Sequence, residues 1–354
     1  MTRQSKAALA AIVGLAIGLG TLAGVVLALR DTNGGGSAGP GPAFTDVVAT
    51  GETGDLTPTD VLPTGLTRTI DVGGFPNAVA AGAGAVWVVG DGRRVTKIDL
   101  DTAAIVGRIG AGDDLGSERP CGIAVGLDTV WITTVSGQVA RINPQTNHLT
   151  RLIHTEDAAC VAVGAGSVWV TSPNRGVVTR IDPETNDIVA EIPVAGFPQG
   201  IAVGFGSVWV AAGDPPEGLG GNVARIDPLT NEVVRTIPVP DVPEFLAVGA
   251  GSVWITSDRG TIREVDPGTN QLLGTEIRIA DGGRTTVAVG GGAVWAAVIQ
   301  GPDTVGAVVR IDPESAQIDG DPIPVGESPV GMAFGGGSLW VANYNDGTVS
   351  ALSP

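Results

Sequence analysis

The stretch Ile201-Ala-Val-Gly-Phe-Gly-Ser-Val-Trp-Val210 decides the fold, because near copies of it recur along the chain. Residues 161–170, 246–255 and 287–296 repeat it with few changes, and looser copies end at the other three tryptophans. The seven Trp residues are spaced 38 to 45 residues apart, at positions 87, 131, 169, 209, 254, 295 and 340. A period of this length indicates a repeat architecture.

A second block follows most of the tryptophans. Its copies include Arg141-Ile-Asn-Pro-Gln-Thr-Asn147, Arg180-Ile-Asp-Pro-Glu-Thr-Asn186 and Arg225-Ile-Asp-Pro-Leu-Thr-Asn231. In such a turn Asp accepts a backbone hydrogen bond, Pro presets φ and Asn tolerates the left-handed exit. A further apolar stretch follows each copy, so each repeat predicts four short strands rich in Val and Ile. In the fourth repeat we expect them at 200–203, 207–211, 223–226 and 232–239.

Four-stranded units with this period are typical of β-propeller blades, so the sequence predicts an all-β, seven-bladed propeller. Both faces of the second strand are apolar, as a sheet buried between two neighbours requires. We therefore expect the Trp side chains to pack between blades. The last repeat lacks its fourth strand, whereas Leu66–Val72 has the fourth-strand pattern and precedes the first complete repeat. This predicts that Leu66–Val72 pairs beside Thr348–Leu352 and closes the ring without a free edge.

These two blocks resemble those of the YVTN family of β-propellers and, within it, virginiamycin B lyase-like proteins. The resemblance covers residues 66–354. For the lyases it implies a catalytic histidine with acidic partners and Mg²⁺ at the mouth of the central channel. The only two histidines, His148 and His154, fall in the expected outermost strand of the second repeat. A histidine there is too far out to act on a channel-bound substrate, so no catalytic residue is carried over.

The amino-terminal segment predicts a membrane anchor. Residues 7–29 are uncharged and apolar, and as a helix they would span about 34 Å, enough for a bilayer core. Arg3 and Lys6 predict that the start lies inside the cell. The alternative is a secretory signal that is cleaved, but no convincing cleavage site follows. The expected organisation is therefore a short cytoplasmic end plus anchor (1–30), a flexible Gly/Pro/Thr-rich stalk (31–65) and an extracytoplasmic propeller (66–354).

The charge balance bears on possible partners. The whole chain has a formal net charge of −17 at pH 7. Its first 30 residues contain three basic side chains and no acid, so the remaining residues have a net charge of −20. A surface this acidic repels phosphate backbones, so nucleic-acid binding is not expected. The predicted partner is an unknown protein or small molecule outside the cytoplasm.

Polar residues that interrupt the repeat pattern near the channel mouth are the candidate ligand-binding residues. Arg119 and Arg284 fill a slot that proline occupies in four other repeats, and Glu244 precedes a first strand. The full candidate set is Asn77, Arg119, Gln199, Glu244, Arg284 and Asn343. The alternative is a solvated rim without a ligand. Neither 214–217 nor 343–346 has the spacing of a calcium loop, and no metal or cofactor site is predicted.

The two cysteines, Cys121 and Cys160, fall at the first strands of neighbouring blades. An oxidising compartment would favour a disulfide between them, and two small buried thiols are the alternative.

The function that these patterns favour is a binding or sensing module on a membrane-anchored propeller. A lyase-like or other metal-assisted enzyme at the channel mouth is the alternative, and a purely structural surface protein is a third. The Gly-x-Gly copies lead into strands and lack the helix of a nucleotide site, so they predict hairpin turns.

Overall fold

The computed structural model describes residues 65–90, 94–110, 122–213, 220–274, 276–280, 283–299 and 305–353. The predicted anchor and all of the predicted stalk except Gly65 lie outside these residues and remain predictions. The described residues hold one short 3-10 helix, η1 (Pro173–Arg175), and no helix in them is long and apolar enough to cross a bilayer.

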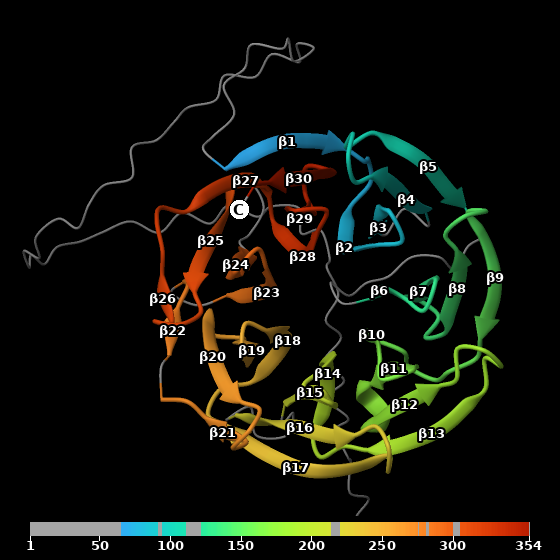
Figure 1. Cartoon of the computed structure of the whole chain (residues 1–354), viewed down its shortest axis with the longest axis vertical. Coiled ribbons are helices and arrows are strands. Elements are labelled where there is room, and N and C mark those ends of the chain that lie inside the picture. Colours follow the sequence, from blue (N-terminus) through green and yellow to red (C-terminus); the bar gives the residue numbers. More distant parts are fainter. Residues whose placement is uncertain are drawn as a thin grey trace, which may run out of the picture. The chain divides into compact units, whose positions relative to one another are not determined.

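The described residues form seven antiparallel sheets arranged around a ring, as Figure 1 shows. In blades 1 to 4 the strands follow one another outward in chain order. Blade 1 contains β2 (Pro76–Gly82), β3 (Ala85–Gly90), β4 (Arg94–Asp99) and β5 (Ile105–Gly110). Blade 2 contains β6 (Ile123–Gly126), β7 (Thr129–Thr133), β8 (Val139–Asn143) and β9 (His148–Ile153). Blade 3 contains β10 (Val161–Gly164), β11 (Ser167–Ser172), β12 (Val177–Ile181) and β13 (Ile188–Pro193). Blade 4 contains β14 (Phe197–Gly204), β15 (Ser207–Gly213), β16 (Gly221–Asp227) and β17 (Glu232–Val239).

Blades 5 and 6 differ in that the outer strand is split into two short pieces. Blade 5 contains β18 (Pro243–Gly249), β19 (Ser252–Ser257), β20 (Thr261–Asp266), β21 (Gln271–Leu272) and β22 (Ile277–Arg278). Blade 6 contains β23 (Arg284–Gly290), β24 (Ala293–Ile299), β25 (Val305–Asp312), β26 (Gln317–Ile318) and β27 (Ile323–Glu327). Both outer pieces pair with the same third strand, β20 or β25.

Blade 7 confirms the predicted ring closure. It consists of β28 (Pro329–Gly335), β29 (Ser338–Asn343), β30 (Thr348–Leu352) and the amino-terminal strand β1 (Leu66–Asp71). Strand β1 pairs antiparallel with β30, from Leu66 opposite Leu352 to Asp71 opposite Thr348. The backbone N–H groups of Val72 and Gly73 donate to Gly347 O at 3.0 Å, which extends the pairing past the strand end. The seventh sheet therefore combines the first strand of the propeller with its last three strands.

The innermost strands contact one another in a closed circle, β2–β6–β10–β14–β18–β23–β28 and back to β2. Crowding at this circle explains the glycine that ends each of these strands. A Cβ atom at Gly164 would lie only 2.6 Å from Val203 of the next blade, closer than real Cβ atoms approach. Equivalent contacts join successive blades all round the circle, and Gly335 of blade 7 faces Ala81 of blade 1.

The tryptophans fill the widening gaps farther out, as predicted. All seven are at most 2% exposed and pack within the core between blades. In six of them the indole N–H donates to the carbonyl of the glycine five residues earlier, at 3.0 to 3.1 Å. The polar atom of a large apolar side chain is therefore satisfied inside the core.

The Asp-Pro turns also form as predicted. Asp182 Oδ1 accepts the backbone N–H groups of Glu184 and Thr185, and Asn186 has a φ of 64°. These backbone hydrogen bonds stabilise the carboxylate and hold the pKa of Asp182 below its usual range. The pKa values of Asp99, Asp266 and Asp312 are lowered by the same kind of hydrogen bond, from the backbone N–H of Thr102, Thr269 and Ser315.

Four successive blade junctions share a contact that we term the cation–turn contact. Arg225 of blade 4 illustrates it: its guanidinium lies 4.9 Å from the Trp209 ring centroid and donates to Pro267 O and Asn270 Oδ1 of blade 5. Arg180 makes the same pair of hydrogen bonds to Pro228 and Asn231. The cations of the four contacts are Lys97, Arg141, Arg180 and Arg225, and the turn residues are Asn147, Asn186, Asn231 and Asn270.

The junction between blades 5 and 6 lacks both partners of this contact. Glu264 stands opposite Trp254, where blade 4 has Arg225, and Ala316 occupies the turn position of Asn270. Glu264 instead accepts a hydrogen bond from Ser252 of its own blade. Both partners are also replaced between blades 7 and 1, where Ala351 stands opposite Trp340 and Ala103 holds the turn position.

Candidate functional site

The strand order gives the ring two different faces. The hairpins between first and second strands and the Asp-Pro turns lie on one face, because antiparallel strands reverse direction at every connection. The opposite face, which we term the entry face, holds the starts of the innermost strands and the loops between second and third strands. All described residues of the predicted site lie at this face or at the strand ends beside it.

Glu244 and Arg284 are brought together by the fold. Glu244 is the second residue of β18 and its side chain is only 9% exposed, whereas Arg284 begins β23 and is 46% exposed. Arg284 Nε lies 2.8 Å from Glu244 Oε1, and the guanidinium carbon lies 5.6 Å from the Phe245 ring centroid. A carboxylate this buried requires a charged partner, and Arg284 supplies it across the junction of blades 5 and 6.

The structure explains why Arg284 reaches this position. In the sequence, Arg284 occupies the slot of a strand-opening proline, and in the structure Pro243 and Arg284 are both the first residue of an innermost strand. An arginine in place of proline adds a long cationic side chain at the rim, and β23 pairs with β24 from Arg284 onward without the register shift that follows Pro243 in β18.

The other predicted residues are not brought into this pair. Asn77 is buried in β2, and Gln199 of β14 contributes its backbone carbonyl to the Thr171 hydroxyl at 2.8 Å. Asn343 is fully buried, and its Nδ2 donates to Thr348 Oγ1 and Ser350 Oγ of its own blade. Arg119 lies outside the described residues, so its predicted role remains a prediction.

The predicted disulfide also remains a prediction. Cys160 is 1% exposed and directly precedes β10, while Cys121 lies outside the described residues. The 214–217 segment, which the sequence shows without calcium-loop spacing, lies outside them too.

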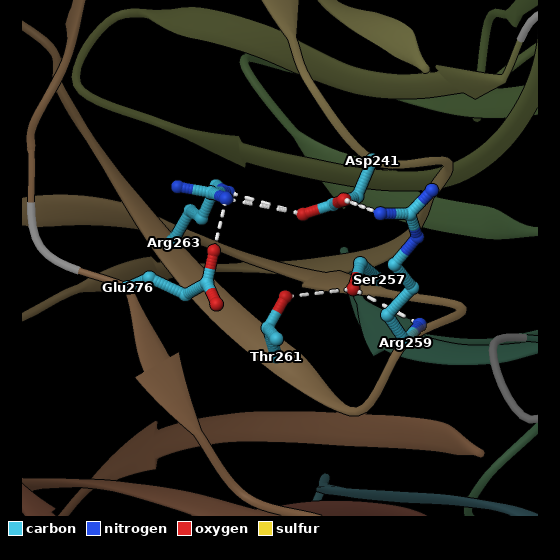
Figure 2. A network of polar contacts seen from close by, with 6 residues as sticks. All are labelled: Asp241, Ser257, Arg259, Thr261, Arg263 and Glu276. Atoms are coloured by element: carbon cyan, nitrogen blue, oxygen red, sulfur yellow. Dashed lines mark hydrogen bonds and ion pairs between the residues drawn. The ribbon is translucent and has the colours of Figure 1, made fainter. Parts of the chain in front are cut away.

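Sequence reasoning missed a second group of ion pairs next to Glu244 and Arg284. Asp241, 8% exposed, lies in the connection from blade 4 to blade 5, and its two carboxylate oxygens face different arginines. Asp241 Oδ1 is 3.3 Å from Arg259 Nη1, and Oδ2 is 3.2 Å from Arg263 Nη2. Figure 2 shows Asp241 between the two guanidinium groups, with Glu276 paired to the same Nη2 of Arg263 as Asp241. One sequence feature could have indicated these ion pairs: Arg263 occupies a strand position that Thr179 or Ala224 holds in other blades.

Arg259 lies in a loop that is anchored to both neighbouring connections. Asp258 N donates to Val242 O at 3.1 Å, and Ile279 N donates to Gly260 O at 2.9 Å. Arg259 N donates to Ser257 Oγ, which also bonds Thr261 Oγ1 (Figure 2). In addition, Arg259 and Gly283 form a parallel β-bridge, so Arg259 lies beside the residue that precedes Arg284.

Comparison with known proteins supports the fold. No family model matches the chain, and no curated protein matches it. Among solved structures, a chain of hydrazine synthase from Kuenenia stuttgartiensis is similar, with a TM-score of 0.65 at 12% identity. The match covers 85% of this chain and 99% of that one. At this identity the likeness shows a shared propeller architecture and nothing about activity.

The chemistry available at the described entry face is ionic. Its two buried carboxylates each face arginine, a permanent cation that cannot exchange a proton near neutral pH. His148 in β9 and His154 just beyond it are both exposed at the outer edge of blade 2, as the sequence predicted for a peripheral position. Among the described residues no group of three or more His, Cys, Asp or Glu side chains is placed to hold a metal ion.

Proposed function

We propose that this protein is a membrane-anchored, extracytoplasmic binding propeller of the YVTN type, which recognises a ligand through its entry face. The observation that carries the proposal is the Glu244–Arg284 ion pair, in which a half-exposed arginine is held across two blades by a buried carboxylate. A charged group fixed in this way on a rigid scaffold suits recognition, because little side-chain freedom is lost on binding. The apolar segment 7–29 and the repeat blocks support the anchor and the family.

A binding role is tested by comparing the two faces of the ring. The full-length chain would be crosslinked in the cells that produce it, with Arg259→Glu as the entry-face variant and Glu184→Lys as the control. Both residues are exposed, and Glu184 lies in an Asp-Pro turn on the opposite face. We expect a specific partner that is lost with Arg259→Glu and retained with Glu184→Lys. Loss with both variants, or no specific partner, would count against the proposal.

The location is tested separately on the same full-length chain. We expect it to stay in the membrane pellet after carbonate extraction, and external protease to reach the propeller in intact cells. Release by carbonate, or protection from external protease, would contradict the anchored, outward-facing arrangement.

A further inference from the structure

Two exposed arginines at the entry face are held in place by different buried carboxylates. Arg259 is 61% exposed and faces Asp241, and Arg284 is 46% exposed and faces Glu244. Each guanidinium carries five N–H donors in a planar fork. The ion pairs engage Nη1 of Arg259 and Nε of Arg284, and the large exposed fractions leave other donors open to solvent.

These two arginines come from segments that lie side by side. The Arg259–Gly283 bridge places Arg259 next to the residue preceding Arg284. Their carboxylate partners, Asp241 and Glu244, are three residues apart in the chain, so the Cα atoms of these partners lie at most about 11 Å apart. The two forks can therefore approach one small ligand group from adjacent backbone positions.

Both side chains are also restrained before any ligand binds. The Arg259 loop is tied to the connections on both sides through Val242 and Ile279. The Arg284 guanidinium lies over the ring of Phe245, which is itself only 5% exposed. Arginine forks prepared in this way match planar oxyanions, which they bind through two parallel hydrogen bonds.

The local charge decides which oxyanion fits. In the two ion-pair groups, Arg259, Arg263 and Arg284 are balanced by Asp241, Glu244 and Glu276. No surplus positive charge is left to hold a multiply charged phosphate on a region of the chain that carries −20 overall. A singly charged carboxylate needs only the open fork donors.

We propose that Arg259 and Arg284 form a binding site for a carboxylate group, such as a peptide carboxyl terminus, an acidic side chain or a free small acid. The inference rests on the proposed binding function and names the chemistry of its ligand. The proposed ligand group is a monoanionic carboxylate and not a phosphate.

The test is an NMR titration of arginine Nε–H signals in the full-length chain in detergent micelles. The probes are acetate, N-acetyl-trialanine with a free carboxyl group, its carboxamide, and N-acetyl-glutamate amide. We expect the tripeptide acid to bind at least about tenfold more tightly than the carboxamide, the ratio expected when charge-assisted hydrogen bonds are lost. Acetate binding as tightly as the tripeptide acid would assign the site to free acids, and tighter peptide or glutamate binding would assign it to a protein partner.

Two variants at the proposed site and one control variant elsewhere on the surface show whether binding depends on these arginines. Arg259→Ala leaves Asp241 paired with Arg263, and Arg284→Lys keeps the charge near Glu244, so both should fold. Each should weaken the acid roughly tenfold. Arg235→Ala, on the exposed outer strand β17, should change nothing. Equal affinity for acid and carboxamide, no binding of any acid, or an equal effect of Arg235→Ala would overturn the inference. Retained partner capture in that case would leave the proposed function standing.

Discussion

The four junctions that join blades 1 to 5 and the junction of blades 5 and 6 are held together by side-chain contacts on different faces of the ring. The first four are joined near the Asp-Pro turns by a cation that stacks on Trp and bonds the next blade's Asn, as in Arg225 with Asn270. The junction of blades 5 and 6 has Glu264 and Ala316 at those positions and is joined at the entry face by Glu244 and Arg284. The contact is also absent between blades 7 and 1, where Ala351 stands opposite Trp340 and Ala103 holds the turn position. At the junction of blades 5 and 6, charged residues gather on the opposite face, and this is the site we propose for binding.

The largest expected effect comes from removing a tryptophan on each side of this comparison. Trp209→Ala should reduce the free energy of unfolding by about 3 to 5 kcal/mol through lost burial and the cavity left behind. Trp254→Ala should cost about 1 kcal/mol less, because Glu264 stands opposite Trp254 in place of the cation that Arg225 provides over Trp209. Urea unfolding followed by circular dichroism measures both. Equal losses would mean that the stacked cation adds nothing.

The cation–turn contact itself should have the next largest effect. Arg225→Ala removes hydrogen bonds to Pro267 O and Asn270 Oδ1 and the contact with Trp209, and should cost about 2 kcal/mol. Glu264→Ala, the matched change in blade 5, should cost less than about 1 kcal/mol. A double-mutant cycle of Arg225→Ala with Asn270→Ala should give a coupling of about 1 kcal/mol. A coupling near zero would show that the two residues do not stabilise the junction together.

Introducing the cation–turn contact at the junction of blades 5 and 6 is a sharper test, with a smaller expected change in the free energy of unfolding. Ser252 already occupies the position of Ser207, which accepts from Arg225 Nε, and Ala316 has a φ of 52°, which asparagine tolerates. The double variant Glu264→Arg with Ala316→Asn should therefore gain about 1 kcal/mol over the sum of the single variants. Additive effects in the same unfolding assay would show that this junction cannot adopt the contact.

The smallest expected effect is a pH dependence of the turns. The pKa of Asp182 is lowered in the folded chain, so its stabilising contribution is present above its ordinary value near 3.8 and is lost as the pH falls through the folded pKa. Blade 2 has Asn143 at this position, with the same hydrogen bonds to the backbone. Asp182→Asn should thus make unfolding slightly less sensitive to pH below about 4. An unchanged acid profile would indicate that this turn carboxylate does not contribute.

Much of the fold was predictable because it repeats within the sequence. The period of the tryptophans, the Asp182 turn type and the pairing of β1 with β30 all follow from local patterns, and all three are confirmed. Strand ends were less accurate: β14 begins at Phe197 rather than Gly200, because pairing with β15 continues past a bulge.

The site was predictable only where a residue differs from the residue type that the other repeats have at the same position. Glu244 and Arg284 stood out because one replaces a small or neutral residue and the other a proline. Asp241 and Arg259 lie in loops that have no repeat pattern to depart from, and only the folded connections bring them together. The split outer strands of blades 5 and 6 were missed for the same reason, since β21 and β22 are too short to show a period.

Hydrogen exchange of the full-length chain, followed by mass spectrometry, tests the central contrast most directly. We expect the slowest exchange in the third strands of blades 2 to 4, β8, β12 and β16, which have cation–turn contacts on both sides. We expect faster exchange in the equivalent strands β20 and β25, which flank the junction without that contact. Equal protection of these two groups of strands would contradict the proposed difference between the junctions.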